Sequence, residues 1–174
     1  MTLESDPAVA SMFVASKPQL WRRAWFLPTV LFLVVLAVGL RYMNIALLHY
    51  DSVRLAQALE SNFVNGGFHG ISAGGRFGLV VVASLIYLPF YLAGQNADFA
   101  VRFTGVLMLA LSAVALYMFT LEYSGRKICA AAATLLLSSV AFFIIPSTYG
   151  KEHSMAVFFL VMACYCALRS HRSE

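Results

Sequence analysis

The stretch FTGVLMLALSAVALYMFTL, residues 103–121, contains nineteen consecutive residues without a charged side chain. A helix of ~20 such residues crosses the ~30 Å hydrocarbon core of a bilayer. Similar apolar runs occupy residues 25–40, 77–94, 128–146 and 155–168. The chain is 61% hydrophobic and only 11% charged, whereas about 25% of the residues of a soluble domain are charged. These features predict an all-α, polytopic integral membrane protein.

The first apolar run is predicted to be an uncleaved membrane anchor. WFLPTVLFLVVLAVGL, residues 25–40, is extended beyond Arg41 by YMNIALL to residue 48. A cleaved signal peptide is the alternative, but the polar segment before the run is long and no A-x-A site precedes Arg41. Residues 1–24 are therefore expected to form a cytoplasmic N-terminal tail.

Lysine and arginine residues concentrate in cytoplasmic loops, so their distribution predicts topology. If the N-terminus is cytoplasmic and all five runs cross, seven of these residues lie outside and five inside. If 77–94 lies at the interface or re-enters, seven lie inside and five outside. We therefore expect four transmembrane helices, an interfacial or re-entrant segment at 77–94, and a short cytoplasmic tail at 169–174. Pro89 suits such a broken segment.

The segment HYDSVRLAQALESNFVNGG, residues 49–67, lies between two apolar runs. Leu55, Leu59 and Phe63 recur every four residues, which predicts an amphipathic helix along the membrane surface. Gly66 is a plausible C-terminal stop. Asp51 is expected at the N-cap position. The same carboxylate is a candidate for chemistry, and the two roles are compatible.

Three further polar residues are candidate site residues. Glu152 precedes the last apolar run and shares the predicted outer face with Asp51, although it could also cap that run. Arg102 stands at a membrane boundary, where an arginine either anchors the helix or binds phosphate. His49 lies two residues before Asp51 and is a further candidate for substrate binding.

The sequence lacks the motifs that are typical of several function classes. No basic face interleaved with aromatic residues is present, so no nucleic-acid partner is expected. Cys164-x-Cys166 has no histidine or cysteine partner at zinc spacing, and no metal ligand set is assigned. The glycines of 66–78 are not followed by GK[ST], so they do not form a phosphate loop.

Several segments resemble, in order, the N-terminal part of the polyprenol-dependent membrane glycosyltransferases of the GT-C class. This class includes dolichyl-phosphate-mannose protein mannosyltransferases and lipid A aminoarabinose transferases. HYDSVRLAQALESN resembles the first external loop, with its acidic residue and juxtamembrane helix. GGRFGLVVVASLIYLPFYLAGQNADFAVRF resembles the next segment and contains Arg102. TGVLMLALSAVALYMFTLEYSGRKICAAAATLLLSSVAFFIIPSTYGKE resembles two spans joined by a short basic loop and followed by Glu152. The resemblance covers roughly residues 25–168.

The resemblance implies an inverting sugar transfer from a polyprenyl-phosphate donor on the non-cytoplasmic face. Asp51 matches the general base, and Glu152 matches a second external acid that positions the acceptor or, in metal-using members, a divalent cation. Arg102 matches an arginine with a structural or phosphate-adjacent role. Where the class often has Asp-Glu, this chain has Asp51-Ser52, so a divalent cation is a candidate cofactor without an assigned site.

Members of the class have later spans and a later external loop that contribute to the donor site. Residues 25–168 are therefore expected to be the N-terminal part of the catalytic module, and the isolated chain is expected to be inactive. Its expected partners are the lipid-linked donor, membrane lipids, and a missing C-terminal half or partner subunit, in a bacterial inner membrane. The alternative is a small non-catalytic scaffold or accessory subunit, which would tolerate Asp51→Asn.

Overall fold

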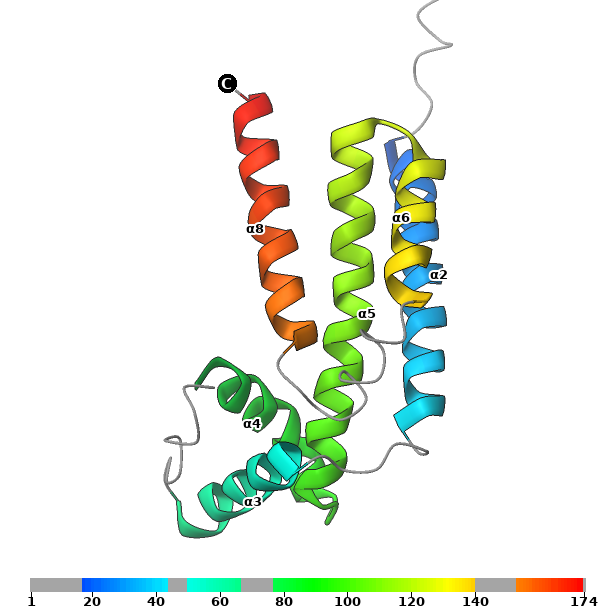
Figure 1. The fold of residues 1–174 in the computed structure, drawn as a ribbon. Helices are drawn as coiled ribbons and strands as arrows, with labels where there is room; N and C mark the ends of the chain where they lie inside the picture. The colour runs from blue at the N-terminus through cyan, green and yellow to red at the C-terminus, as the bar shows by residue number, and fades with distance from the viewer. Residues whose placement is uncertain (1–16, 44–49, 67–76, 140–152, 174) are drawn as a thin grey trace, which may run out of the picture.

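The computed structural model describes residues 17–43, 50–66, 77–139 and 153–173, and every regular element in these ranges is an α-helix (Figure 1). The helices are α2 (Lys17–Met43), α3 (Tyr50–Asn65), α4 (Phe77–Leu92), α5 (Ala97–Ser124), α6 (Lys127–Ser139) and α8 (His153–Ser173). The predicted all-α membrane fold is confirmed.

Within the described ranges, three stretches of helix are long and apolar enough to cross a membrane. They are Trp25–Met43 of α2, the whole of α5, and His153–Arg172 of α8. The apolar helices Val80–Leu92 and Lys127–Ser139, in α4 and α6, are shorter. The run predicted at 128–146 begins with α6, and its end lies outside the described residues.

Helix α5 is the centre of the molecule, because it contacts each of the other five described helices. Its 28 residues extend over ~42 Å at 1.5 Å per residue, which exceeds the hydrocarbon core. Alanines at 97, 100, 110, 113 and 115 of α5 are buried. Small residues let neighbouring backbones approach closely in a membrane bundle. At Gly39 of α2, an added Cβ would lie 2.6 Å from Val106 Cγ1 of α5.

Helices α2 and α6 run antiparallel to α5, whereas α8 runs parallel to it (Figure 1). Leu31 of α2 packs with Tyr117 of α5, and Val35 packs nearer the start of α5, with Leu109. The start of α8 is bonded to Gly105 and Ser112, near the middle of α5. At its other end, Arg172 pairs with Glu122 of α5 at 3.0 Å. The start of α2, the α5–α6 turn and the end of α8 therefore share one end of the bundle.

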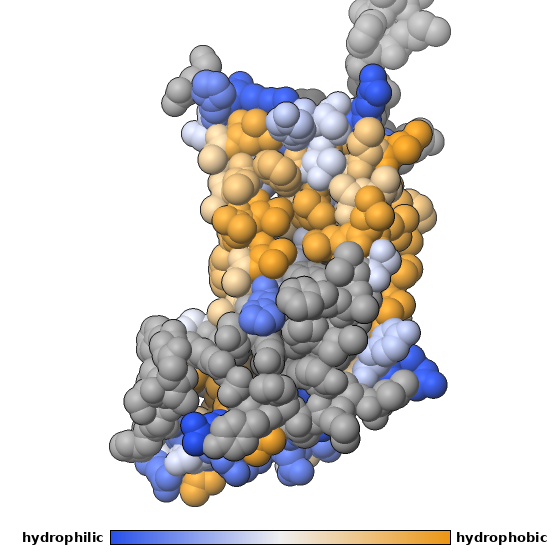
Figure 2. All heavy atoms as spheres, in the orientation of Figure 1, coloured by the Kyte–Doolittle hydropathy of each residue, from blue (hydrophilic) through white to orange (hydrophobic). Residues whose placement is uncertain are grey.

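We call this end the basic end; it carries Arg126, Lys127, Arg169 and Arg172. The other end holds the end of α2, the start of α5, and helices α3 and α4, and we call it the α3–α4 end (Figure 1). In the space-filling view, a hydrophobic band lies between hydrophilic surfaces at the two ends (Figure 2). Because α2 ends and α5 begins at the same end, the chain between them need not cross the membrane.

The predicted surface helix is present as α3. Its end matches the prediction, since Gly66 follows Asn65 with φ +66°, a backbone conformation that favours glycine. Its start does not, because α3 already includes Tyr50 and Asp51. Asp51 is thus in the first helical turn and not at the N-cap. A carboxylate is also favourable in that turn, where the helix dipole is positive.

Candidate functional site

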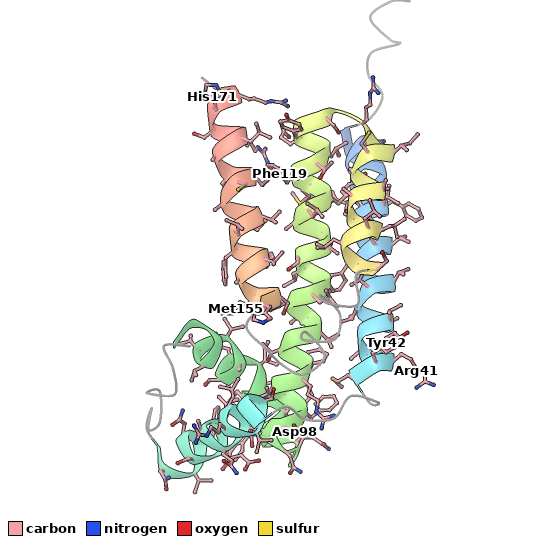
Figure 3. All side chains as sticks on the ribbon, in the orientation of Figure 1. Arg41, Tyr42, Asp98, Phe119, Met155 and His171 are labelled. Atoms are coloured by element: carbon pink, nitrogen blue, oxygen red, sulfur yellow. The ribbon has the colours of Figure 1, made fainter. Side chains whose placement is uncertain are left out.

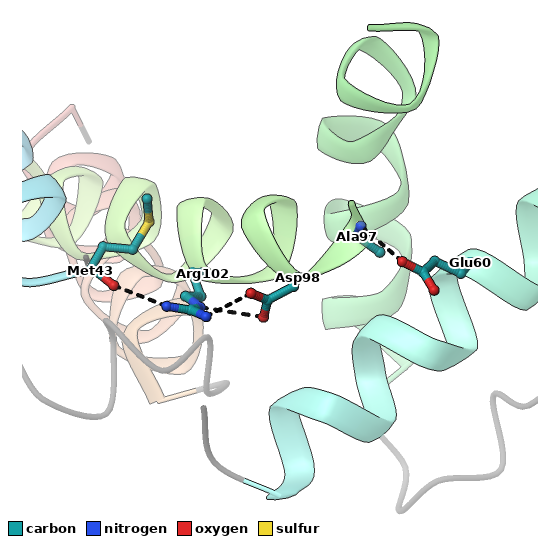
Figure 4. Close-up of polar contacts among 5 residues, drawn as sticks. All are labelled: Met43, Glu60, Ala97, Asp98 and Arg102. Atoms are coloured by element: carbon teal, nitrogen blue, oxygen red, sulfur yellow. Dashed lines mark hydrogen bonds and ion pairs between the residues drawn. The ribbon is translucent and has the colours of Figure 1, made fainter. Parts of the chain in front are cut away.

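Charged side chains and helix ends meet where α2 ends and α5 begins (Figures 3 and 4). Asp98 and Arg102 lie four residues apart on α5, a spacing that places them on one face. Arg102 donates from Nη2 to Asp98 Oδ2 at 2.6 Å and from Nε to Oδ1 at 3.3 Å. Its Nη1 donates to the carbonyl oxygen of Met43 at 3.1 Å. One guanidinium therefore joins the start of α5 to the last residue of α2.

The bond to Met43 has a clear physical basis. The last carbonyls of a helix have no partner within it and carry a partial negative charge. A planar guanidinium can donate hydrogen bonds to such a carbonyl and to a carboxylate at the same time. With only 19% of its side chain exposed, Arg102 is held between the two helices. These contacts assign Arg102 a structural role, and its phosphate-binding role stays a prediction.

Glu60 of α3 binds a second helix end, the N-terminus of α5. Its Oε1 accepts a hydrogen bond from the backbone N–H of Ala97, the first residue of α5, at 3.3 Å. Asn96, the N-cap residue of α5, makes no side-chain capping bond. A carboxylate near a helix N-terminus is favourable because the free N–H groups there carry partial positive charge. The side-chain cap of α5 thus comes from α3 and not from Asn96, the residue just before α5.

An apolar interface lies beside these polar contacts. Leu59 of α3 is fully buried, and a core cluster joins α3 to α4 and to the first turns of α5. Phe63 of α3 lies edge-on to Tyr87 of α4, with ring centroids 4.9 Å apart. Burial, followed by the nearby charge of Glu60, raises the pKa of Tyr87 above its ordinary value. Apolar packing and the Glu60 hydrogen bond therefore both hold α3 in place.

The start of α8 is bonded to α5 by buried serines. Ser154 Oγ donates to the carbonyl oxygen of Gly105 at 3.1 Å. Ser112 Oγ lies 2.8 Å from the carbonyl oxygen of Ser154 and 2.7 Å from that of Met108, so its single proton is shared between two acceptors. Ser112 and Ser154 are fully buried. Such bonds are retained in apolar surroundings because water cannot replace them.

The structure places the four predicted site residues as follows. Arg102 has the contacts given above. Asp51 belongs to the first turn of α3, at the α3–α4 end. His49 and Glu152 lie outside the described residues. Proximity of the two candidate carboxylates therefore stays a prediction.

Among the described residues, no three histidine, cysteine or acidic side chains are grouped as a metal site would need. Ser52, which follows Asp51, is 1% exposed and packs into the protein. The described residues thus do not form a cation site. The candidate divalent cation stays a prediction.

Sequence reasoning did not identify the contact roles of Glu60, Asp98, Ser112 and Ser154. The four-residue spacing of Asp98 and Arg102 is a local signal that predicts their ion pair. Glu60 and Ala97 are 37 residues apart, and Ser112 and Ser154 are 42 apart. No periodicity in the sequence connects residues at such separations.

The fold defines a polytopic membrane protein with an acid-bearing helix and a polar junction at one end of its bundle. Comparison with known families specifies it further, since the family dolichyl-phosphate-mannose-protein mannosyltransferase matches residues 85–174, just over half of the chain. The chain belongs to this family of membrane glycosyltransferases, and the resemblance seen in the sequence is confirmed. The match includes Arg102 and Glu152 and begins after His49 and Asp51. No curated protein and no solved structure matches the chain.

Proposed function

We propose that the protein is the N-terminal part of an enzyme that transfers a sugar from a polyprenyl-phosphate donor to an acceptor hydroxyl. The observation that carries this proposal is membership of the mannosyltransferase family over residues 85–174. Dolichyl-phosphate mannose, which the family's name contains, is the first donor to test, and a protein or peptide hydroxyl is the first acceptor.

We propose further that the reaction takes place at the α3–α4 end, on the non-cytoplasmic face. The basic end carries Arg126, Lys127, Arg169 and Arg172, and positive residues are typical of cytoplasmic loops. This assignment makes the start of α2 cytoplasmic and leaves α4 at the outer surface without a crossing. A bacterial inner membrane is the proposed location.

In the proposed reaction, Asp51 acts as the general base. The acceptor oxygen attacks the anomeric carbon of the sugar while its proton passes to the Asp51 carboxylate. The bond from the anomeric carbon to the donor phosphate breaks, and the polyprenyl phosphate leaves with the electron pair. Attack opposite the leaving group inverts the anomeric configuration. Glu152 positions the acceptor, and His49 contributes to substrate binding.

Arg102 acts in this proposal beside the donor phosphate. Cationic groups near a leaving phosphate stabilise the charge that develops on it. The bonds of Arg102 to Asp98 and Met43 hold its guanidinium in one place, which suits a group that must meet a phosphate without reorganising.

The test is Asp51→Asn in membranes that contain the complete enzyme, which is this chain together with the proposed C-terminal half or partner subunit. Transfer of labelled mannose from polyprenyl-phosphate mannose to a serine- and threonine-rich peptide is measured, with protein amount determined in parallel. Loss of a general base should lower kcat about 10²-fold or more. Glu122→Gln is the matched control, because Glu122 lies at the basic end and should not affect transfer. Wild-type activity in Asp51→Asn would remove Asp51 from the mechanism.

A further inference from the structure

Glu60 is a charged residue at an exposed position of α3, yet its carboxylate has a specific backbone partner. The hydrogen bond from Ala97 N–H to Glu60 Oε1 joins the later half of α3 to the first residue of α5. Asn96 leaves the same helix end without a side-chain cap. Among the described residues, Glu60 therefore provides the side-chain cap of α5, although it belongs to a different helix.

The segment that carries Asp51 is held to α5 on both sides. Before it in the chain, Arg102 of α5 holds the carbonyl oxygen of Met43. After it, Glu60 holds the N–H of Ala97. The signs of the two charges suit the two helix ends, since a cation meets a C-terminus and an anion meets an N-terminus. Both contacts converge on the first turns of α5 (Figure 4).

The apolar packing of α3 against the start of α5 involves several small side chains. The apolar face of α3 meets small side chains on α5, among them Ala97 and Ala100. Small residues offer a smooth surface with few features to resist sliding. A directional hydrogen bond is lost when its atoms move apart by about 1 Å, so the Glu60 contact adds a positional constraint to this packing.

We propose that Glu60 is a positioning residue that sets the place of Asp51 by capping α5. The inference rests on the proposed function of Asp51. Glu60 does not touch the reacting atoms; it acts through the position of α3. A displacement of about 1 Å in a catalytic group can lower a rate by about 100-fold, so a modest contact far from the chemistry can matter for kcat.

Three substitutions separate the hydrogen bond from the charge. Glu60→Gln keeps an acceptor oxygen at the same reach and removes the charge. Glu60→Asp keeps the charge and withdraws the carboxylate by one methylene. Glu60→Ala removes both. The position is exposed, so all three should fold. Gln57→Ala is the matched control, because it shortens another exposed polar side chain on the same helix.

The complete enzyme, which contains this chain and the proposed C-terminal half or partner subunit, is assayed in lipid nanodiscs with polyprenyl-phosphate mannose and the peptide acceptor. Backbone hydrogen exchange is followed by mass spectrometry. We expect kcat to fall about 10-fold or more in Glu60→Ala and Glu60→Asp. Donor KM should stay unchanged, and Glu60→Gln should keep most of the wild-type rate. Exchange should rise at the start of α5 and in α3 in the two impaired variants, and Gln57→Ala should match the wild type.

Wild-type kcat in Glu60→Ala and Glu60→Asp would overturn the positioning role while leaving the proposed function intact. An equal loss in Gln57→Ala would also overturn it, because the effect would then belong to the surface of α3 in general. Absence of transfer by the wild-type protein would overturn the proposed function and the role of Glu60 with it. The exchange data would still report whether Glu60 caps α5.

Discussion

Nη1 of Arg102, near the start of α5, donates a hydrogen bond to the carbonyl oxygen of Met43, the last residue of α2, at 3.1 Å. The two residues are 59 positions apart in the chain. Between them lie α3 and α4, so this contact closes the segment that forms the α3–α4 end. The ion pair of Arg102 with Asp98 orients the guanidinium for the contact.

Arg102→Lys should therefore destabilise the protein although it keeps the charge. A lysine ammonium lacks the planar set of N–H groups with which Arg102 donates to Asp98 and Met43 at the same time. We expect a loss of about 1.5–3 kcal/mol, the range for hydrogen bonds of charged groups, seen as a lower thermal unfolding temperature in detergent. Arg126→Lys at the exposed α5–α6 turn is the control. An unchanged unfolding temperature with a raised donor KM would favour phosphate binding over the structural role.

Gly39→Ala should destabilise the contact between α2 and α5. An added Cβ would lie 2.6 Å from Val106 Cγ1, and the buried valine has little room to move. Overpacking of this kind costs about 1–3 kcal/mol. Adding Val106→Ala should restore part of the loss. At Gly78 of α4, an added Cβ would meet Met155 Cε at an ordinary 3.5 Å, so Gly78→Ala should be neutral or stabilising. Equal effects at both glycines would contradict the close approach.

Ser154→Ala and Ser112→Ala should each loosen the start of α8. Interhelical hydrogen bonds in membrane proteins contribute about 0.6–2 kcal/mol, and each substitution removes one such bond. Thermal unfolding and hydrogen exchange at the start of α8 are the measurements. Ser84→Ala removes a buried hydroxyl that has no hydrogen-bond partner in the part of the chain that the structure describes, so it should not destabilise the protein. A loss in Ser84→Ala as large as in the other two would contradict the interhelical role.

Cysteines at positions 96 and 124 should be labelled from opposite sides of the membrane. These residues flank α5, which spans the bundle from the α3–α4 end to the basic end. With Cys129, Cys164 and Cys166 replaced, Asn96→Cys should react with an impermeant maleimide from the non-cytoplasmic side. Ser124→Cys should react only after the cytoplasmic side is opened. Labelling of position 124 from outside would overturn the proposed orientation and the four-crossing topology.

Local features of the sequence were sufficient to predict the helices. The uncharged run at 103–121 predicts a membrane helix because hydrocarbon excludes unpaired backbone groups. The period of Leu55, Leu59 and Phe63 predicts α3, and Gly66 predicts its end. The start of α3 was less well predicted, because Asp51 is as favourable in the first turn as at the N-cap.

The sequence by itself thus determined the membrane class, the helices and the family of this protein, since hydropathy, periodicity and ordered motifs are properties of neighbouring residues. Only the tertiary structure decided which helix ends meet. That Glu60 caps α5, that Arg102 holds Met43, and that Gly39 lies against Val106 depend on the packing of helices far apart in the chain. The physical reason is that the register between helices is selected by side-chain shape and directional hydrogen bonds summed over a whole interface, which no local pattern encodes.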